Sequence, residues 1–270
     1  MIPSTFDYVR ATDLAAAAEA VRAGGEDAKV IAGGMSLIPL MKLRLAEPVL
    51  LVDLAGLDEL RYIKVEDGRL RLGALTRHVD IARSPVVASA LPLLAQVAGE
   101  VGDAQVRARG TIGGVLAHAD SAGDYCTVAM MLDAEIVTTR NRYAATDFLL
   151  DFMTTPLEPD ELITEVSFPV LDGPHDYVKF RRRRADWAIV GVGVQAGPDG
   201  WRIGLTNVAS TALRARAGEE ALAGGASAAE AAAVVAESVH PSDDLATPAA
   251  YREDLVRTLT ERALNSVGVS

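Results

Sequence analysis

Short apolar runs with β-branched residues alternate with glycine pairs along the first fifty residues, and this pattern predicts strands, tight turns and helices. The clearest case is the stretch from Lys29 to Lys42. It begins with Val30 and Ile31, continues through Gly33-Gly34, and ends in a second apolar run. The pattern predicts a buried strand, a glycine loop and a helix, with Ser36 as the helix N-cap.

A glycine loop between a strand and a helix suits a phosphate, because bare backbone N–H groups can approach it closely. The alternative is a plain turn between core elements. The loop lacks the Lys-Ser or Lys-Thr of a P-loop and the G-x-G-x-x-G spacing of a dinucleotide fingerprint. The loop alone therefore leaves both interpretations open.

The flanking pattern predicts a small α/β unit over residues 1–55. Thr12-Asp13 precedes an alanine-rich helix that Gly24-Gly25 ends, and residues 48–53 read as a second buried strand. Residues 56–170 form a second unit. It contains a hairpin around Asp67-Gly68, further strands at 134–139 and 162–168, and helices at 76–84 and 89–99.

The third unit, residues 171–270, is expected to run from strands into helices. Apolar alternation predicts one or two strands over 177–195 and another over 201–208. Two alanine-rich helices follow, and Thr247-Pro248 announces a last one with Tyr251, Leu255 and Leu259 as its buried stripe. The fold class is therefore α+β, with two subdomains and a small C-terminal α+β domain.

Composition narrows the possible functions. The 270 residues carry a net charge of −11, which argues against binding to nucleic acid or an anionic membrane surface. The single cysteine, Cys126, excludes an iron–sulfur cluster or a cysteine-based zinc site held by this chain alone. No signal peptide and no run of about 18 apolar residues is found, so we expect no membrane span and a cytoplasmic protein.

A second glycine-rich stretch covers residues 101–124. We interpret it as a long loop, and loops of this length in compact domains tend to be functional or disordered. Ile112, Val115 and Leu116 argue against disorder, and a surface loop with capping Asp and Ser residues is the alternative.

Together the two stretches resemble the FAD-binding medium subunit of molybdenum hydroxylases, the family of the carbon monoxide dehydrogenase medium subunit and the xanthine dehydrogenase flavin domain. The resemblance rests on residues 32–42 and on Arg109-Gly110-Thr111-Ile112-Gly113-Gly114. Residues 73–78 and 179–188 also match family segments. The resemblance implies two subdomains of the vanillyl-alcohol-oxidase type that clamp FAD, and a C-terminal domain behind them.

The resemblance also implies the cofactor contacts. The residues that match the first loop, whose backbone holds the diphosphate, are Ala32, Gly33, Gly34, Met35, Ser36 and Leu37. Those that match the second loop are Thr111, Gly113, Gly114 and Val115, and the polar positions toward the adenosine and ribitol are His118, Asp120 and Asp124. Leu162 matches a backbone contact to adenine, and Lys179 a lysine near the flavin pyrimidine edge.

No catalytic side chain and no metal site is expected in this chain. FAD is expected to be non-covalent, because neither His118 nor Cys126 stands in an attachment motif. The sequence departs from the family pattern at Val115, where asparagine is usual, and at Ser121, where proline is usual. We expect these two departures to affect the reduction potential of the flavin and the affinity of the chain for FAD.

Three functions follow. The first is an electron-transfer subunit, working with a small [2Fe–2S] subunit and a large molybdopterin subunit, that passes electrons to an external acceptor. The second is a self-contained FAD oxidoreductase that acts directly on a small molecule. The third is a non-catalytic nucleotide-binding protein.

Overall fold

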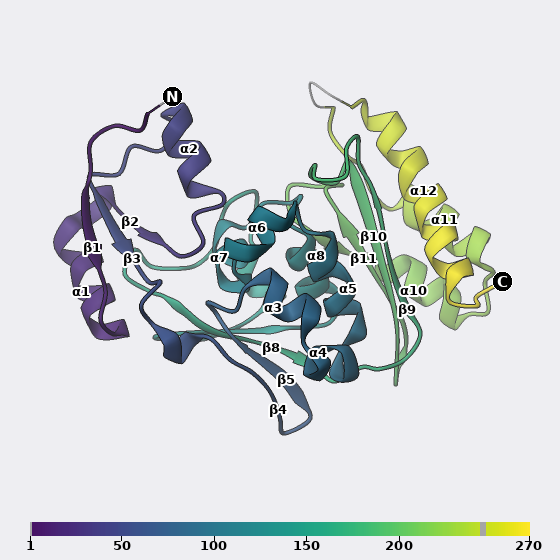
Figure 1. Ribbon diagram of the computed structural model, residues 1–270. Coiled ribbons are helices and arrows are strands. Elements are labelled where there is room, and N and C mark those ends of the chain that lie inside the picture. The colour runs from purple at the N-terminus through teal and green to yellow at the C-terminus, as the bar shows by residue number, and fades with distance from the viewer. Residues whose placement is uncertain (1, 244–246) are drawn as a thin grey trace.

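The described part of the chain folds into three sheets that follow one another along the sequence, with helices packed against them (Figure 1). The computed structural model describes residues 2–243 and 247–270. An α+β architecture was predicted and is confirmed.

The N-terminal sheet has three parallel strands in the order β1–β3–β2. The strands are β1 (Asp7–Arg10), β2 (Ala28–Ile31) and β3 (Leu50–Asp53), and the helices are α1 (Leu14–Gly24) and α2 (Leu37–Leu43). The predicted strand, glycine loop and helix are confirmed. Asp13 caps α1 by accepting from Ala16 N at 2.7 Å. Ser36 precedes α2, but its side chain makes no capping hydrogen bond, so the predicted cap contact is wrong.

The central sheet has five antiparallel strands in the order β4–β5–β8–β6–β7. They are β4 (Ile63–Glu66), β5 (Arg69–Gly73), β6 (Glu135–Thr138), β7 (Arg142–Ala144) and β8 (Ile163–Pro169). Asp67 and Gly68 turn the first hairpin with φ of 52° and 70°, as a type I′ turn requires. The helices of this part are α3 (His78–Arg83), α4 (Pro85–Ala90), α5 (Pro92–Glu100), α6 (Ala104–Arg109), α7 (Ile112–His118), α8 (Asp124–Met131) and α9 (Ala145–Phe148).

The third sheet is antiparallel with strand order β12–β11–β10–β9. Its strands are β9 (His175–Phe180), β10 (Val190–Gly197), β11 (Gly200–Thr206) and β12 (Leu213–Arg214). The helices that follow are α10 (Arg216–Ala223), α11 (Ala228–Glu237) and α12 (Ala249–Ser266). The sheet lies between these helices on one side and α5 and α8 on the other (Figure 1).

Each part has its own apolar core, and the central core is the largest. It includes Tyr125, Phe148 and Phe168, none of which is exposed. Tyr177 in β9 and Ala212 in the loop between β11 and β12 also belong to this central core. The central and third parts are therefore packed together rather than loosely tethered.

Two expectations are corrected. Residues 101–124 are mostly helical rather than a loop, because Asp103 and Thr111 cap two short helices. Gly113 in the second helix lies where Ala74 approaches closely. In α12, Leu255 and Leu259 are buried at 8% and 5% exposure, but Tyr251 is 46% exposed. Residues four apart differ by about 40° around a helix, so Tyr251 and Leu259 differ by about 80°. With Leu255 and Leu259 on the buried face, Tyr251 therefore lies outside it.

Candidate functional site

The first glycine loop lies between the end of β2 and the start of α2. Gly34 has a φ of +74°, a conformation that glycine adopts without strain. A Cβ on Gly33 would lie 2.3 Å from the carbonyl oxygen of Arg109, so only glycine fits there. The loop is thus held directly against the second glycine-rich segment.

The second segment turns at Thr111 into α7. The Thr111 hydroxyl accepts a hydrogen bond from Gly114 N at 3.2 Å and caps the helix. A Cβ on Gly113 would lie 2.7 Å from the Cβ of Ala74, so this glycine lets α7 pack against the end of β5. The two segments therefore approach each other through backbone, with no bulky side chain between them.

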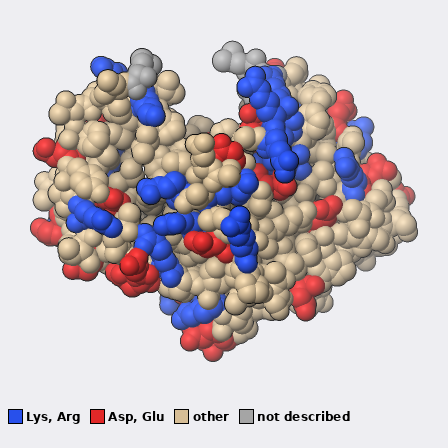
Figure 2. Space-filling model, in the orientation of Figure 1, with Lys and Arg blue, Asp and Glu red and all other residues tan. Residues whose placement is uncertain are grey.

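A cleft of about 820 Å³ opens between these segments and the third sheet, and the space-filling view shows it as the notch at the top (Figure 2). Fourteen of the fifteen predicted site residues line it: Ala32, Gly33, Gly34, Met35, Ser36, Leu37, Thr111, Gly113, Gly114, Val115, His118, Asp124, Leu162 and Lys179. The exception is Asp120, whose carboxylate accepts from Ala122 N at 2.9 Å and shapes the turn before α8. The structure therefore brings together residues up to 147 positions apart, from 32 to 179.

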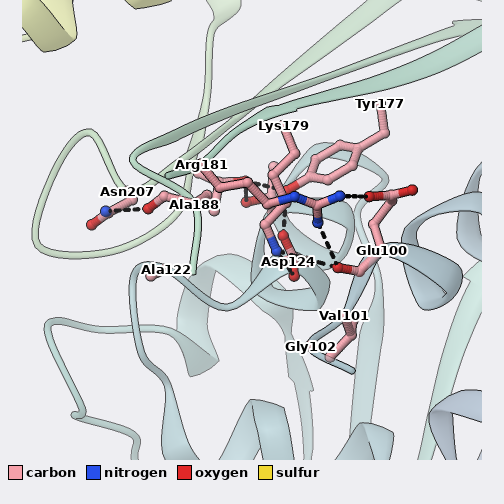
Figure 3. Close-up of polar contacts among 12 residues, drawn as sticks. Glu100, Val101, Gly102, Ala122, Asp124, Tyr177, Lys179, Arg181, Ala188 and Asn207 are labelled. Carbon is pink, nitrogen blue, oxygen red and sulfur yellow. Dashed lines mark hydrogen bonds and ion pairs between the residues drawn. The ribbon is translucent and has the colours of Figure 1, made fainter. Parts of the chain in front are cut away.

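Two of these residues form a buried ion pair. Lys179 Nζ lies 2.8 Å from Asp124 Oδ2, and the side chains are 3% and 4% exposed (Figure 3). The Tyr177 hydroxyl donates to Asp124 Oδ1 at 2.7 Å. Burial raises the pKa of Asp124, and the ammonium of Lys179 and the Tyr177 hydroxyl oppose that rise. Lys179 thus brings a balanced charge to the cleft, where the resemblance implied a lysine facing the flavin.

The same corner ties the third sheet to the helices of the central part. Arg181 donates to the carbonyl oxygen of Glu100 at 3.2 Å and to its carboxylate at 2.5 Å (Figure 3). Asn207 donates from its side chain to Ala188 O at 2.7 Å. These contacts hold both ends of the segment 181–188, which lines the cleft with Ala185, Asp186 and Trp187.

Sequence reasoning missed two buried polar side chains in the cleft wall, His78 and Tyr125. They are 1% and 0% exposed, and their ring centroids are 5.1 Å apart. Burial, helped by Arg107, lowers the pKa of His78 to about 4, so this imidazole is neutral at pH 7. His78 Nδ1 and the Tyr125 hydroxyl have no hydrogen-bond partner in the described part of the chain. The only sequence signal was that His78 ends the family segment beginning at Gly73.

The site fits the FAD that the resemblance implies. The first glycine segment offers backbone N–H groups where a diphosphate needs close approach, and Gly113 and Gly114 keep the facing wall free of bulky side chains. Cys126 is buried and its pKa is raised to about 12, mainly by burial, so it is not a nucleophile. Within residues 2–243 and 247–270, no group of three or more His, Cys, Asp or Glu side chains could hold a metal ion. Across the same residues, no helix combines the length and apolarity of a membrane span.

Comparison with known proteins supplies the family context. Residues 4–171 match the family described as the FAD binding domain in molybdopterin dehydrogenase, and residues 175–267 match the CO dehydrogenase flavoprotein C-terminal domain. The carbon monoxide dehydrogenase medium chain of Hydrogenophaga pseudoflava is 37% identical over 98% of both chains. Subunit alpha of the 6-hydroxypseudooxynicotine dehydrogenase complex of Paenarthrobacter nicotinovorans is 35% identical over 98% of this chain and 95% of that protein. In quinoline 2-oxidoreductase from Pseudomonas putida 86, one chain superimposes with a TM-score of 0.93, 30% identity and coverage of 99% and 98%.

Proposed function

This chain belongs to the family of FAD-binding medium subunits of molybdenum hydroxylases, and from that premise we propose that it transfers electrons within a complex of three kinds of subunit. FAD is its cofactor, and it is an oxidoreductase subunit. In the proposal, electrons come from [2Fe–2S] clusters on a small partner and leave to an external acceptor such as NAD, a quinone or oxygen. A large partner carries the molybdopterin site and meets the substrate.

One observation carries the proposal: both glycine segments and the third sheet line a single cleft, while the chain has only one cysteine, which is buried. A chain with one thiol cannot ligate a [2Fe–2S] cluster alone, since four protein ligands are needed. A cluster that feeds the flavin must then lie on another chain. The cytoplasmic location expected from the sequence stays part of this proposal, and so do the domain limits 1–55, 56–170 and 171–270.

The residues that would hold FAD divide by chemistry. The backbone N–H groups of residues 32–37 suit the diphosphate, because a glycine loop permits close approach. The N–H groups of residues 112–115 already donate within the protein, so the second segment would contribute its lack of bulky side chains. The imidazole of His78 and the ring of Tyr125 would lie in the wall behind the cofactor, since their side chains are 1% and 0% exposed. The ammonium of Lys179, paired with Asp124, lies in a buried corner of the cleft, where a positive charge would act strongly on the flavin. Bound FAD supplies the redox chemistry, taking up electrons singly and giving up two.

The test is to purify the chain with and without the subunits encoded beside it. We expect a flavin absorbance band and co-purification of a cysteine-rich small subunit and a large subunit. Chemical reduction of the small subunit's clusters should then bleach the flavin band only in the assembled complex. A yellow lone protein that turns over a small molecule without partners would instead support the self-contained oxidoreductase.

The two departures from the family pattern, Val115 and Ser121, bear on that second function and have different surroundings. Val115 lines the cleft from α7, so its effect would be on the cofactor. Ser121 is buried, and its carbonyl accepts from Asn207 N at 2.9 Å, which joins the central part to the third sheet. Neither position adds a catalytic side chain, so we do not favour the second function. The non-catalytic alternative is set aside because the matched relatives are dehydrogenase subunits.

A further inference from the structure

A second pocket, of about 320 Å³, adjoins the FAD cleft and shares Ala32, Leu75 and Thr111 with it. Its lining contains four arginines and one acid: Arg10, Arg61, Arg77, Arg109 and Asp58. Figure 2 shows Lys and Arg side chains gathered where the part that contains the N-terminal sheet meets the part that contains the central sheet. We call this the arginine pocket.

The one carboxylate in the arginine pocket is already used. Asp58 forms an ion pair with Arg61, which also donates to Ala55 O at 2.6 Å. Arg61 Nε is buried and has no partner among the described residues. The guanidinium groups of the other three arginines make no hydrogen bond and no ion pair within residues 2–243 and 247–270.

A second carboxylate near the arginine pocket, Asp53, is also engaged. Asp53 lies opposite Arg10 in the sheet, but it accepts from the Tyr8 hydroxyl at 2.6 Å and from Ala55 N at 2.8 Å. Two arginines outside the pocket, Arg22 and Arg214, pair with Asp160 and Glu219, both below 3 Å. A chain with a net charge of −11 therefore collects unneutralised positive charge at one place.

The backbone around two of these arginines is fixed by the FAD-binding segments. Arg77 pairs with Thr111 in an isolated antiparallel bridge. The carbonyl oxygen of Arg109 packs against Gly33. The backbone of these two arginines is thus held at the rim of the pocket, while their side chains remain free to close around a ligand.

We propose that the arginine pocket binds a phosphate group, as free phosphate or as a phosphate monoester, while FAD occupies the adjoining cleft. Guanidinium forks match phosphate oxygens bidentately, and several converging forks favour a multivalent oxyanion over a single carboxylate. The volume lies in the range of small-molecule sites, about 300–1,000 Å³. This proposal does not depend on the route of electron transfer.

The test is calorimetric titration of the FAD-loaded protein, alone or with its partner subunits, at constant ionic strength. The two probes are inorganic phosphate and glycerol 3-phosphate, which is too small to imitate the adenosine of FAD. We expect saturable one-to-one binding of at least one probe. Binding should weaken at least about tenfold in Arg77→Gln and in Arg109→Gln, each of which removes a charge-assisted contact. Both side chains are exposed, so folding should be kept.

Arg83→Gln is the matched control, because Arg83 is also exposed but lies outside the pocket. It should bind as the wild type does. Binding of only one probe identifies the source of the phosphate group and still supports the proposal. Three results would overturn it: no saturable binding of either probe, unchanged binding in both pocket variants, or binding to FAD-free protein that FAD abolishes. If unchanged binding in both pocket variants is accompanied by loss of assembly with the partner subunits, the proposal is overturned and the surface is a protein-docking site. Flavin absorbance reports separately on whether the FAD site itself is intact.

Discussion

Replacing Lys179 by Met tests whether the buried ion pair stabilises this corner of the cleft. Methionine keeps the length and flexibility of the side chain but removes its charge. The pair is 2.8 Å long, with side chains 3% and 4% exposed, so water cannot replace the lost ammonium. Breaking a buried pair costs about 3–5 kcal/mol, and we expect about 3 kcal/mol because Tyr177 still donates to Asp124.

The loss should depend on pH. Burial already raises the pKa of Asp124 above its ordinary value of 3.8, and removing Lys179 raises it further. The folded variant then holds a proton that the unfolded chain releases, so its free energy of unfolding falls as pH rises between the unfolded and folded pKa values. The steepest possible slope is about 1.4 kcal/mol per pH unit. The deficit relative to wild type should therefore be larger at about pH 8 than at about pH 5.

The assay is urea unfolding of the FAD-free protein at both pH values, followed by circular dichroism. The double variant Asp124→Asn/Lys179→Met should recover most of the loss, because neutral partners leave no buried charge. The control is Lys64→Met, since Lys64 is 48% exposed and pairs with Glu66 on the surface. It should change stability by no more than about 0.5 kcal/mol. A pH-independent loss in Lys179→Met that the double variant does not relieve would refute this reasoning.

Three further changes test the cleft. Gly33→Ala should reduce FAD occupancy at least about tenfold, because its Cβ would meet backbone 2.3 Å away. The control Gly99→Ala, whose Cβ would have nothing within 4 Å, should keep FAD. Equal flavin absorbance in both variants would contradict this expectation. Cys126→Ala should retain FAD, and acid precipitation of the wild type should leave the flavin in the supernatant; flavin in the pellet would show a covalent bond. The pKa of His78 is lowered from 6.5 to about 4, so folding loses up to about 3 kcal/mol as pH falls through that window. In urea titrations, His78→Phe should abolish this pH dependence of the free energy of unfolding. The control His240→Phe, at an exposed histidine, should keep it. If the pH dependence persists in His78→Phe, other groups cause it.

Local sequence signals predicted much of the fold. The strand, glycine loop and helix from residue 28 onward, and the hairpin around Asp67-Gly68, depend on contacts within a few residues, so they could be read from spacing. Residues 104–118 were misread because Gly113 and Gly114 look like loop residues. Their reason is tertiary: Gly113 packs on Ala74, which no local pattern reveals.

The site residues divide in the same way. The glycine segments carry recognisable motifs, so their place in the cleft could be anticipated from the family resemblance. The partnership of Lys179 with Asp124 spans 55 positions and joins a side chain of β9 to the first residue of α8. No local pattern therefore indicates that the charge is balanced. His78 was passed over because a lone histidine carries no spacing signal, and only burial makes it notable.

The packing of Tyr177 and Ala212 into the central core has an evolutionary consequence. The two family segments meet between residues 171 and 175, which looks like a place where domains could be exchanged between relatives. A recombinant joined there would inherit Asp124 from one parent and both of its side-chain donors, Tyr177 and Lys179, from the other. Such chimeras should survive only when the two parents agree across this seam. The unit that must be inherited intact in this protein is therefore larger than either family segment alone.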